Sequence, residues 1–111
     1  MTEMFRLSDY RRKKNRQRVF FNRQELRQLM DLYSRRVAMG EWKDYAIDQS
    51  GGLAVFSVFR HTFDAPAFAI AKRAEGRRCD YLVISGQRAI KRGTSIGEVL
   101  AIFNKPLRLI S

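Results

Sequence analysis

A chain of 111 residues buries roughly two thirds of its unfolded surface, enough for one hydrophobic core and too little for a second domain. Its single cysteine excludes an internal disulfide, and no segment approaches the ~20 continuous apolar residues of a membrane-spanning helix. The 22 lysines and arginines outnumber the 11 acids, so the net charge of +11 favours a polyanionic partner, nucleic acid or anionic lipid.

The charge is concentrated at the N-terminus. Residues 11–18 contain six cations and no acid, which are Arg11, Arg12, Lys13, Lys14, Arg16 and Arg18. Residues 1–18 show no sustained hydrophobic period, so we predict a flexible basic arm followed by a single domain over residues 19–111. The arm also carries Met4, Phe5, Leu7 and Tyr10, which can dock on the domain or on a partner. The N-terminus lacks the apolar core of a secretory signal, so we expect a cytoplasmic protein.

The first helix is predicted to begin at Asn22, which is a good N-cap. Glu25 completes a capping box, and Phe21 and Leu26 are spaced for a hydrophobic staple. The helix ends at Gly40, a residue that readily takes the left-handed conformation of a helix stop. The apolar side chains at helical spacing, expected to form the buried stripe, are Leu26, Leu29, Met30, Tyr33 and Val37.

Runs rich in aromatic and β-branched residues then predict five strands, over residues 45–48, 53–59, 67–73, 81–85 and 89–90. Short polar breaks containing glycine lie at 50–52, 75–78 and 85–87, and the third run follows Pro66. Because parallel neighbours need crossovers of about a dozen residues or more, such short connections predict an antiparallel meander. The run at 53–59 is apolar on both faces, so we place it in the middle of the sheet.

A second helix is predicted after Thr94 or Ser95, with Glu98 completing its capping box. Its apolar stripe consists of Ile96, Val99, Leu100 and Phe103. Asn104 and Pro106 end it, and Leu107, Leu109 and Ile110 form a final short strand or packed tail. The predicted class is α+β, with an N-terminal and a C-terminal helix packed on a meander of about four to five strands.

Four stretches of the sequence carry a resemblance to a known family, and the longest is Gly40-Glu41-Trp42-Lys43-Asp44-Tyr45-Ala46-Ile47-Asp48. The others are residues 20–26, 31–35 and 54–60. In these stretches the chain resembles a small, uncharacterised alphaproteobacterial family catalogued as a domain of unknown function, over about residues 19–110. The resemblance implies a bacterial, cytoplasmic source. It supplies no catalytic residues and leaves the arm outside the matching region.

Few residues suggest catalysis or a cofactor. Glu41, Asp44 and Asp48 surround two aromatic side chains, but acid/base chemistry or Mg²⁺ binding needs convergent geometry. We favour the interpretation that Trp42 fills the gap between helix and sheet while these acids pair with arginines. His61 and Cys79 lack companion ligands in the sequence, and the glycines form no nucleotide-binding motif. We therefore expect no enzyme, cofactor or metal.

The main hypothesis is a non-enzymatic binding module that contacts RNA or DNA phosphates. The arm residues given above capture the phosphates, and Arg23, Arg27 and cations of the strands and turns adjust the register. Tyr10, Phe20 and Phe21 can stack on bases or serve as core anchors. A second basic patch on the strands and turns and a scattered solvated surface both remain open, and so does a solvated tail without function. The main alternative is a protein-interaction module or homodimer that uses the apolar sheet.

Overall fold

The computed structural model describes residues 18–61 and 64–104. The prediction of a flexible arm therefore lies outside the described residues, except for Arg18. The same holds for Pro106 and for the tail formed by Leu107, Leu109 and Ile110. The described part begins with a short extended segment, residues 18–22, that leads into the first helix.

Helix α2 spans Arg23–Ala38 and begins as the sequence predicts. The Asn22 side chain accepts a hydrogen bond from the Glu25 backbone N–H at 2.8 Å, and the Glu25 side chain accepts one from the Asn22 N–H at 2.9 Å. This reciprocal capping box satisfies two backbone donors that the first turn would otherwise leave unpaired. At the other end, Gly40 takes a positive φ of 77°, which confirms the predicted helix stop.

The buried face of α2 is only partly the predicted one. Leu29 is fully buried, whereas Val37 is 41% exposed. Leu26, Met30 and Tyr33 are partly buried against the main core, as predicted. Glu25 and Leu32 are more deeply buried than these three, so the helix is rotated slightly relative to the predicted stripe. The physical reason is that the Glu25 carboxylate binds the ammonium group of Lys72 and the hydroxyl group of Tyr81 on the sheet. A prediction based on the spacing of apolar side chains does not include such a polar contact.

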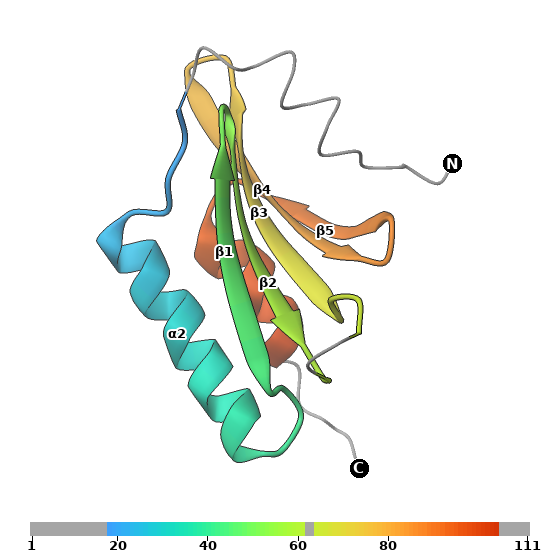
Figure 1. Ribbon diagram of the computed structural model, residues 1–111. Coiled ribbons are helices and arrows are strands. Elements are labelled where there is room, and N and C mark those ends of the chain that lie inside the picture. Colours follow the sequence, from blue (N-terminus) through green and yellow to red (C-terminus); the bar gives the residue numbers. More distant parts are fainter. Residues whose placement is uncertain (1–17, 62–63, 105–111) are drawn as a thin grey trace.

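The five strands form one antiparallel meander in sequence order (Figure 1). Their bounds are β1 Asp44–Ser50, β2 Leu53–Phe59, β3 Phe68–Glu75, β4 Arg78–Ser85 and β5 Arg88–Gly93. Each predicted strand is therefore present, and most are longer than predicted. Strand β2 is interior and buried on both faces, as expected, although the central strand is β3. Gly51 and Gly76 have positive φ in the tight turns β1–β2 and β3–β4, where a side chain would be strained.

The second helix, α3, spans Ile96–Leu100 and continues as the 3₁₀ turn η1, Ala101–Asn104. Ser95 is the N-cap, and its hydroxyl accepts a hydrogen bond from the Glu98 N–H. The Glu98 carboxylate accepts hydrogen bonds from the backbone N–H and the hydroxyl group of Thr94, and not from the Ser95 N–H of a standard capping box. Thr94 and Ser95 therefore share the capping role, which the sequence assigns to one or the other. Neither helix of the described chain is long and apolar enough to cross a membrane.

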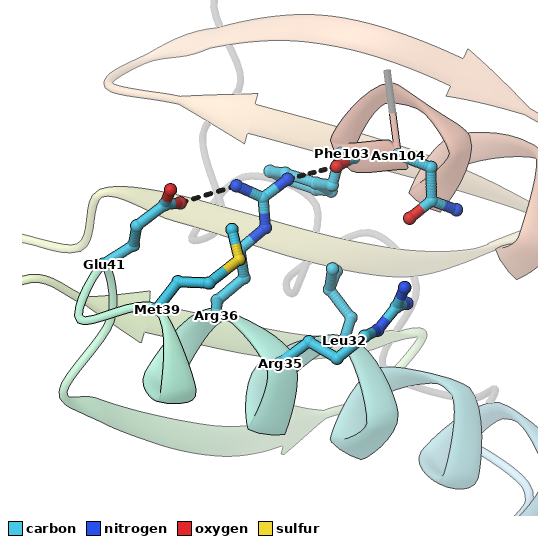
Figure 2. Close-up of a pocket in the computed structure, with 7 residues that line it drawn as sticks. All are labelled: Leu32, Arg35, Arg36, Met39, Glu41, Phe103 and Asn104. Carbon is cyan, nitrogen blue, oxygen red and sulfur yellow. Dashed lines mark hydrogen bonds and ion pairs between the residues drawn. The ribbon is translucent and has the colours of Figure 1, made fainter. Parts of the chain in front are cut away.

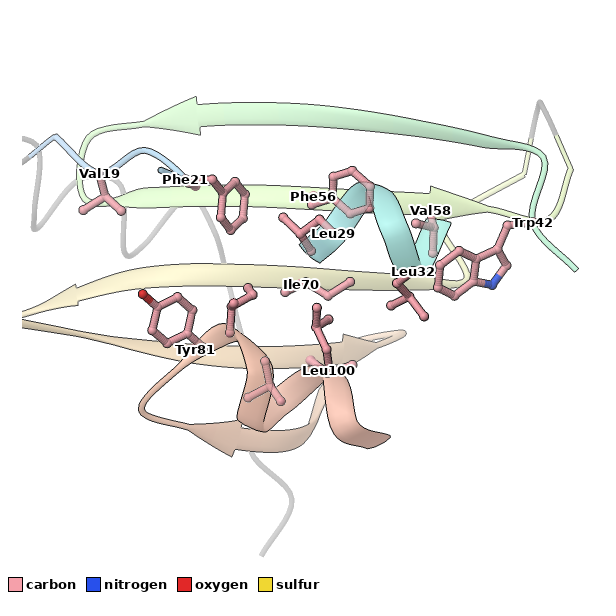
Figure 3. Close-up of a cluster of buried hydrophobic side chains, with 14 of the residues drawn as sticks. Val19, Phe21, Leu29, Leu32, Trp42, Phe56, Val58, Ile70, Tyr81 and Leu100 are labelled. Atoms are coloured by element: carbon pink, nitrogen blue, oxygen red, sulfur yellow. The ribbon is translucent and has the colours of Figure 1, made fainter. Parts of the chain in front are cut away.

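Both helices cover the same face of the sheet and enclose the main core (Figures 1 and 3). Leu29 and Leu32 of α2 and Val99 of α3 meet Phe56 and Ile70 of the sheet in this cluster. Trp42 follows α2 and is 2% exposed, with its ring 5.5 Å from that of Phe103 in η1. The predicted gap-filling role of this tryptophan is confirmed.

A second cluster lies on the opposite face of the sheet, because side chains alternate along each strand. It consists of Leu53, Val55, Ala71, Leu82 and Ile84, with Ala69 and Ala89 packed against them. All of these residues belong to strands, and neither described helix contributes to the cluster.

Candidate nucleic-acid interface

The arm joins the domain at one end of the sheet, where the β1–β2 and β3–β4 turns lie (Figure 1). The Val19 N–H donates to the Gly51 carbonyl oxygen at 3.0 Å, and the Ala74 N–H donates to that of Gly52 at 2.9 Å. Val19 is buried in the main core. The residue that follows Arg18 is therefore fixed in space, and we call this end of the sheet, with residues 18–22, the root of the arm.

Lys72 of β3 holds the root in place. Its Nζ donates to the Phe20 carbonyl oxygen at 2.9 Å and to Glu25 Oε1 at 2.8 Å, and the Tyr81 hydroxyl donates to the other carboxylate oxygen. Glu25 is 6% exposed. A buried carboxylate is stable only when paired and hydrogen-bonded, and here the contacts of Lys72 and Tyr81 connect α2 and the root to the sheet.

The electrostatics of Glu25 and Tyr81 are those of a structural contact. Burial raises the pKa of the Glu25 carboxyl, but hydrogen bonds from Lys72, Tyr81 and the Asn22 backbone outweigh it, so that the pKa lies below its ordinary value. Burial and the hydrogen bond to Glu25 raise the pKa of the Tyr81 hydroxyl. Glu25 is therefore ionised and Tyr81 neutral at pH 7, and neither is poised to exchange a proton.

Exposed arginines lie near both ends of the segment formed by residues 18–22. Arg18 is exposed, Arg77 and Arg78 are exposed in and beside the β3–β4 turn, and Arg23 and Arg27 are exposed on the first turns of α2. In residues 18–61 and 64–104, no carboxylate lies within 4.0 Å of the cationic groups of these five side chains. The predicted binding residues Arg11, Arg12, Lys13, Lys14 and Arg16 lie outside the described residues.

The two aromatic residues of the root have different surroundings. Phe21 is 7% exposed and belongs to the main core, where Leu26 also packs, as expected for the predicted staple. Phe20 is 57% exposed. Of the two rings, only that of Phe20 presents a free surface on which a base could stack.

The remaining cations do not form one patch with the root. Arg73 makes a two-pronged contact with Asp80, with Nε–Oδ1 and Nη2–Oδ2 distances of 3.0 and 2.6 Å. Arg60 lies at the opposite end of the sheet, with its guanidinium 5.9 Å from the Phe68 ring centre. The edge strand β5 carries Arg88, Lys91 and Arg92. The hypothesis of a scattered surface fits these residues better than that of a second patch.

The acidic segment at the start of β1 does not converge on a site. Glu41 pairs with Arg36 at 2.5 Å, as predicted, whereas Asp44 accepts a hydrogen bond from the Tyr45 backbone N–H. Asp44 and Asp48 are exposed on the same face of β1, four residues apart, a separation of about 13 Å along a strand. Such a spacing is too wide for one divalent cation.

His61 and Cys79 lie at opposite ends of the sheet. Cys79 is the second residue of β4 and pairs with Ala74 near the root, whereas His61 follows the end of β2. The part of the chain that the structure describes contains no group of three or more potential metal ligands. The two side chains are therefore too far apart to act together as a nucleophile and its base.

A hollow of about 350 Å³ lies between the end of α2 and η1 (Figure 2). The Arg36 guanidinium crosses it, donating to the Glu41 carboxylate and to the Phe103 carbonyl oxygen. Its central carbon is 5.9 Å from the ring centres of both Trp42 and Phe103. These contacts satisfy the Arg36 cation and connect α2 with η1. The described residues that line the hollow include no nucleophile with an adjacent base.

Sequence analysis missed the Lys72–Glu25–Tyr81 contact. The capping box accounts for Glu25, and Lys72 and Tyr81 face each other across β3 and β4. The signal available in the sequence was that Lys72 and Tyr81 occupy positions that face the main core, next to apolar residues of the same strand face. It gains meaning only after the strand register and the rotation of α2 are known.

Comparison with known proteins identifies a family of unknown function. No curated protein and no solved structure is detectably similar to the chain. A family model described as "Protein of unknown function (DUF2794)" matches residues 19–100, beginning at the root and ending at the last residue of α3. The match confirms the resemblance to a family of unknown function and leaves out the arm. The chain belongs to this family, DUF2794.

Proposed function

We propose that the protein is a small non-enzymatic module that binds RNA or DNA phosphates through residues 11–18. The observation that carries this proposal is the position of the root. A dense cationic segment leaves the domain at residues 18–22, which have exposed arginines near both ends. A guanidinium fork matches the oxygens of a phosphate group, and a run of them follows the backbone of a nucleic acid without reading its sequence.

The domain contributes position rather than chemistry to this binding. Val19 and Phe21 are buried and Lys72 holds the Phe20 carbonyl, so the arm starts from a rigid support. Arg77 and Arg78 extend the positive surface on one side, and Arg23 and Arg27 extend it along α2. Phe20 adds an exposed ring that favours single-stranded partners, whose bases are free to stack. The cytoplasm is the compartment we expect for such a module.

A protein-interaction module or homodimer is the second candidate. Its supporting observation is the second apolar cluster, on the sheet face that neither described helix covers. A partner that docks there would bind largely by apolar burial, so its binding would resist salt. The two candidates therefore differ in the contribution of charge.

Crosslinking and copurification from the native cell test the proposal. The full chain and a variant lacking residues 1–18 are tagged at the C-terminus, crosslinked with ultraviolet light and purified under denaturing conditions. We expect labelled nucleic acid with the full chain and little with the deletion variant. Equal recovery of nucleic acid with both proteins, or recovery of one protein partner with both, would overturn the proposal.

A further inference from the structure

The second cluster is far better shielded from solvent than a bare sheet face. Leu82 and Ala71 are 0% exposed, Leu53 is 2%, Val55 is 4% and Ile84 is 7% exposed. Side chains on a face without a second layer remain in contact with water, because neighbouring strands cover only their flanks. This face therefore requires a covering segment, and neither described helix supplies one.

We propose that the apolar part of the arm, residues 4–10, lies across this face and covers the second cluster. Residues 4–10 contain four large apolar side chains, those of Met4, Phe5, Leu7 and Tyr10, whereas residues 11–17 contain none. They precede the cationic segment, so the arm has an apolar first half and a basic second half. Docking of the first half holds the second half at the rim of the sheet. The proposal does not depend on nucleic-acid binding.

The arm starts in the right place and has the required length. Val19 is hydrogen-bonded to Gly51, in the turn that joins β1 and β2, so the chain leaves at the rim shared by both faces. Tyr10 lies eight residues before Arg18 and can reach about 26 Å, the length of an eight-residue strand. Met4 can reach about 46 Å. The four side chains can thus span the face from the root to its far end.

The surface of this face suits such a segment. A hollow of about 230 Å³ lies at the far end, and its lining includes Val55, Ala69, Ile84 and Pro66. A hollow of this size and character can take an aromatic or leucine side chain. On the root side of this hollow, Asp48 is exposed beside Val55, two residues before the end of β1, where its carboxylate would face the cations that follow Tyr10. Along the arm, the apolar residues come first and the cations follow. On the sheet, the apolar hollow lies at the far end and the exposed carboxylate of Asp48 lies closer to the root, so the two arrangements match.

The C-terminal tail is a weaker candidate for the cover. Residues 105–111 follow η1, which packs on the opposite face through the contact of Phe103 with Trp42. The tail would have to round the edge of the sheet before reaching the cluster, and its seven residues extend at most about 25 Å. A second copy of the chain is the other occupant to be distinguished.

Thiol labelling tests the cover in the full-length chain. Ser57 lies on the covered face, is 9% exposed and lines the hollow, so Ser57→Cys in a Cys79→Ser background places a near-isosteric probe there. The matched control is Ala54→Cys, in the same strand but facing the helices and 1% exposed. The rate of maleimide labelling is measured for each probe with and without residues 2–10.

We expect deletion of residues 2–10 to speed labelling of Ser57→Cys at least tenfold and to leave Ala54→Cys unchanged. The single substitutions Phe5→Ser and Leu7→Ser should each raise the labelling rate of Ser57→Cys by part of this factor. These milder variants keep the test decisive if deletion of residues 2–10 unfolds the domain. The proposal is overturned if the Ser57→Cys rate is indifferent to all three changes. It is also overturned if truncation after Asn104, or dilution of a dimer, exposes the probe instead.

Discussion

Lys72 and Glu25 lie 47 positions apart in the sequence and form an ion pair with an Nζ–Oε1 distance of 2.8 Å. The side chains are 11% and 9% exposed, so the pair is largely removed from water. The same ammonium group donates to the Phe20 carbonyl. One contact thus joins the central strand, the first turn of α2 and the root of the arm.

Breaking this pair is expected to cost about 3–5 kcal/mol of the free energy of unfolding, because it leaves one buried charge without compensation. Lys72→Met removes the cation, and urea unfolding measures the loss. The double variant Glu25→Leu/Lys72→Met should recover much of that loss, since replacing both charges by apolar groups is often nearly neutral. Glu41→Gln, which breaks the more exposed pair with Arg36, should cost about 1 kcal/mol or less. Equal costs for Lys72→Met and Glu41→Gln would contradict the account.

The same carboxylate predicts how stability depends on pH. The pKa of Glu25 is lowered in the folded state from its ordinary value of 4.5, so the unfolded chain binds the proton more readily. The stabilisation is therefore complete above about pH 5 and is lost as the pH falls through the folded-state pKa. Urea unfolding between pH 3 and pH 7 measures it. Glu25→Gln should flatten the acidic limb of the curve, and a variant curve parallel to that of the wild type would refute this assignment.

Asn22→Ala is expected to lower the free energy of unfolding by about 1 kcal/mol, because the Glu25 N–H loses its acceptor. The loss should be larger than for Gln24→Ala, two residues further on and exposed. Thermal unfolding of both variants checks this expectation. A cost for Gln24→Ala as large as that for Asn22→Ala would show that the capping box does not decide where α2 begins.

The sequence predicts the elements well and their mutual orientation less well. The capping box at Asn22 and Gly40 delimit α2, and glycines mark three of the four turns between strands, because these are local effects encoded within a few residues. The rotation of α2 depends on Lys72 and Tyr81, which come close only when β3 and β4 pair. A nonlocal contact of this kind leaves no periodic pattern in the helix itself.

The candidate interface shows the same limit. The basic segment is visible in the sequence, and Arg23 and Arg27 are exposed as expected. That Arg77 and Arg78 lie beside the root follows only from the meander, which brings the β3–β4 turn to the end where the arm attaches. Sequence reasoning also treated the cations of the strands as equivalent, whereas Lys72 and Arg73 are engaged with Glu25 and Asp80.

Arg77 and Arg78 give a local test of the interface. Arg77→Gln/Arg78→Gln should weaken binding of a 20-nucleotide single-stranded RNA severalfold at low salt, since each lost phosphate contact removes roughly 0.7 from the slope of log K against log salt. The matched control is Lys43→Gln/Arg60→Gln, which removes the same charge at the opposite end of the sheet. If both double variants weaken binding equally, net charge rather than the root governs the interaction.

The salt dependence of RNA binding by the arm tests the central claim most directly. Fluorescence anisotropy with the same RNA, between 50 and 200 mM salt, compares the full chain with a variant in which Arg11, Arg12, Lys13, Lys14 and Arg16 are glutamine. The account predicts steeply salt-dependent binding by the full chain, and loss of most of both the affinity and the slope in the variant. Equal affinities and slopes for the two proteins would contradict it.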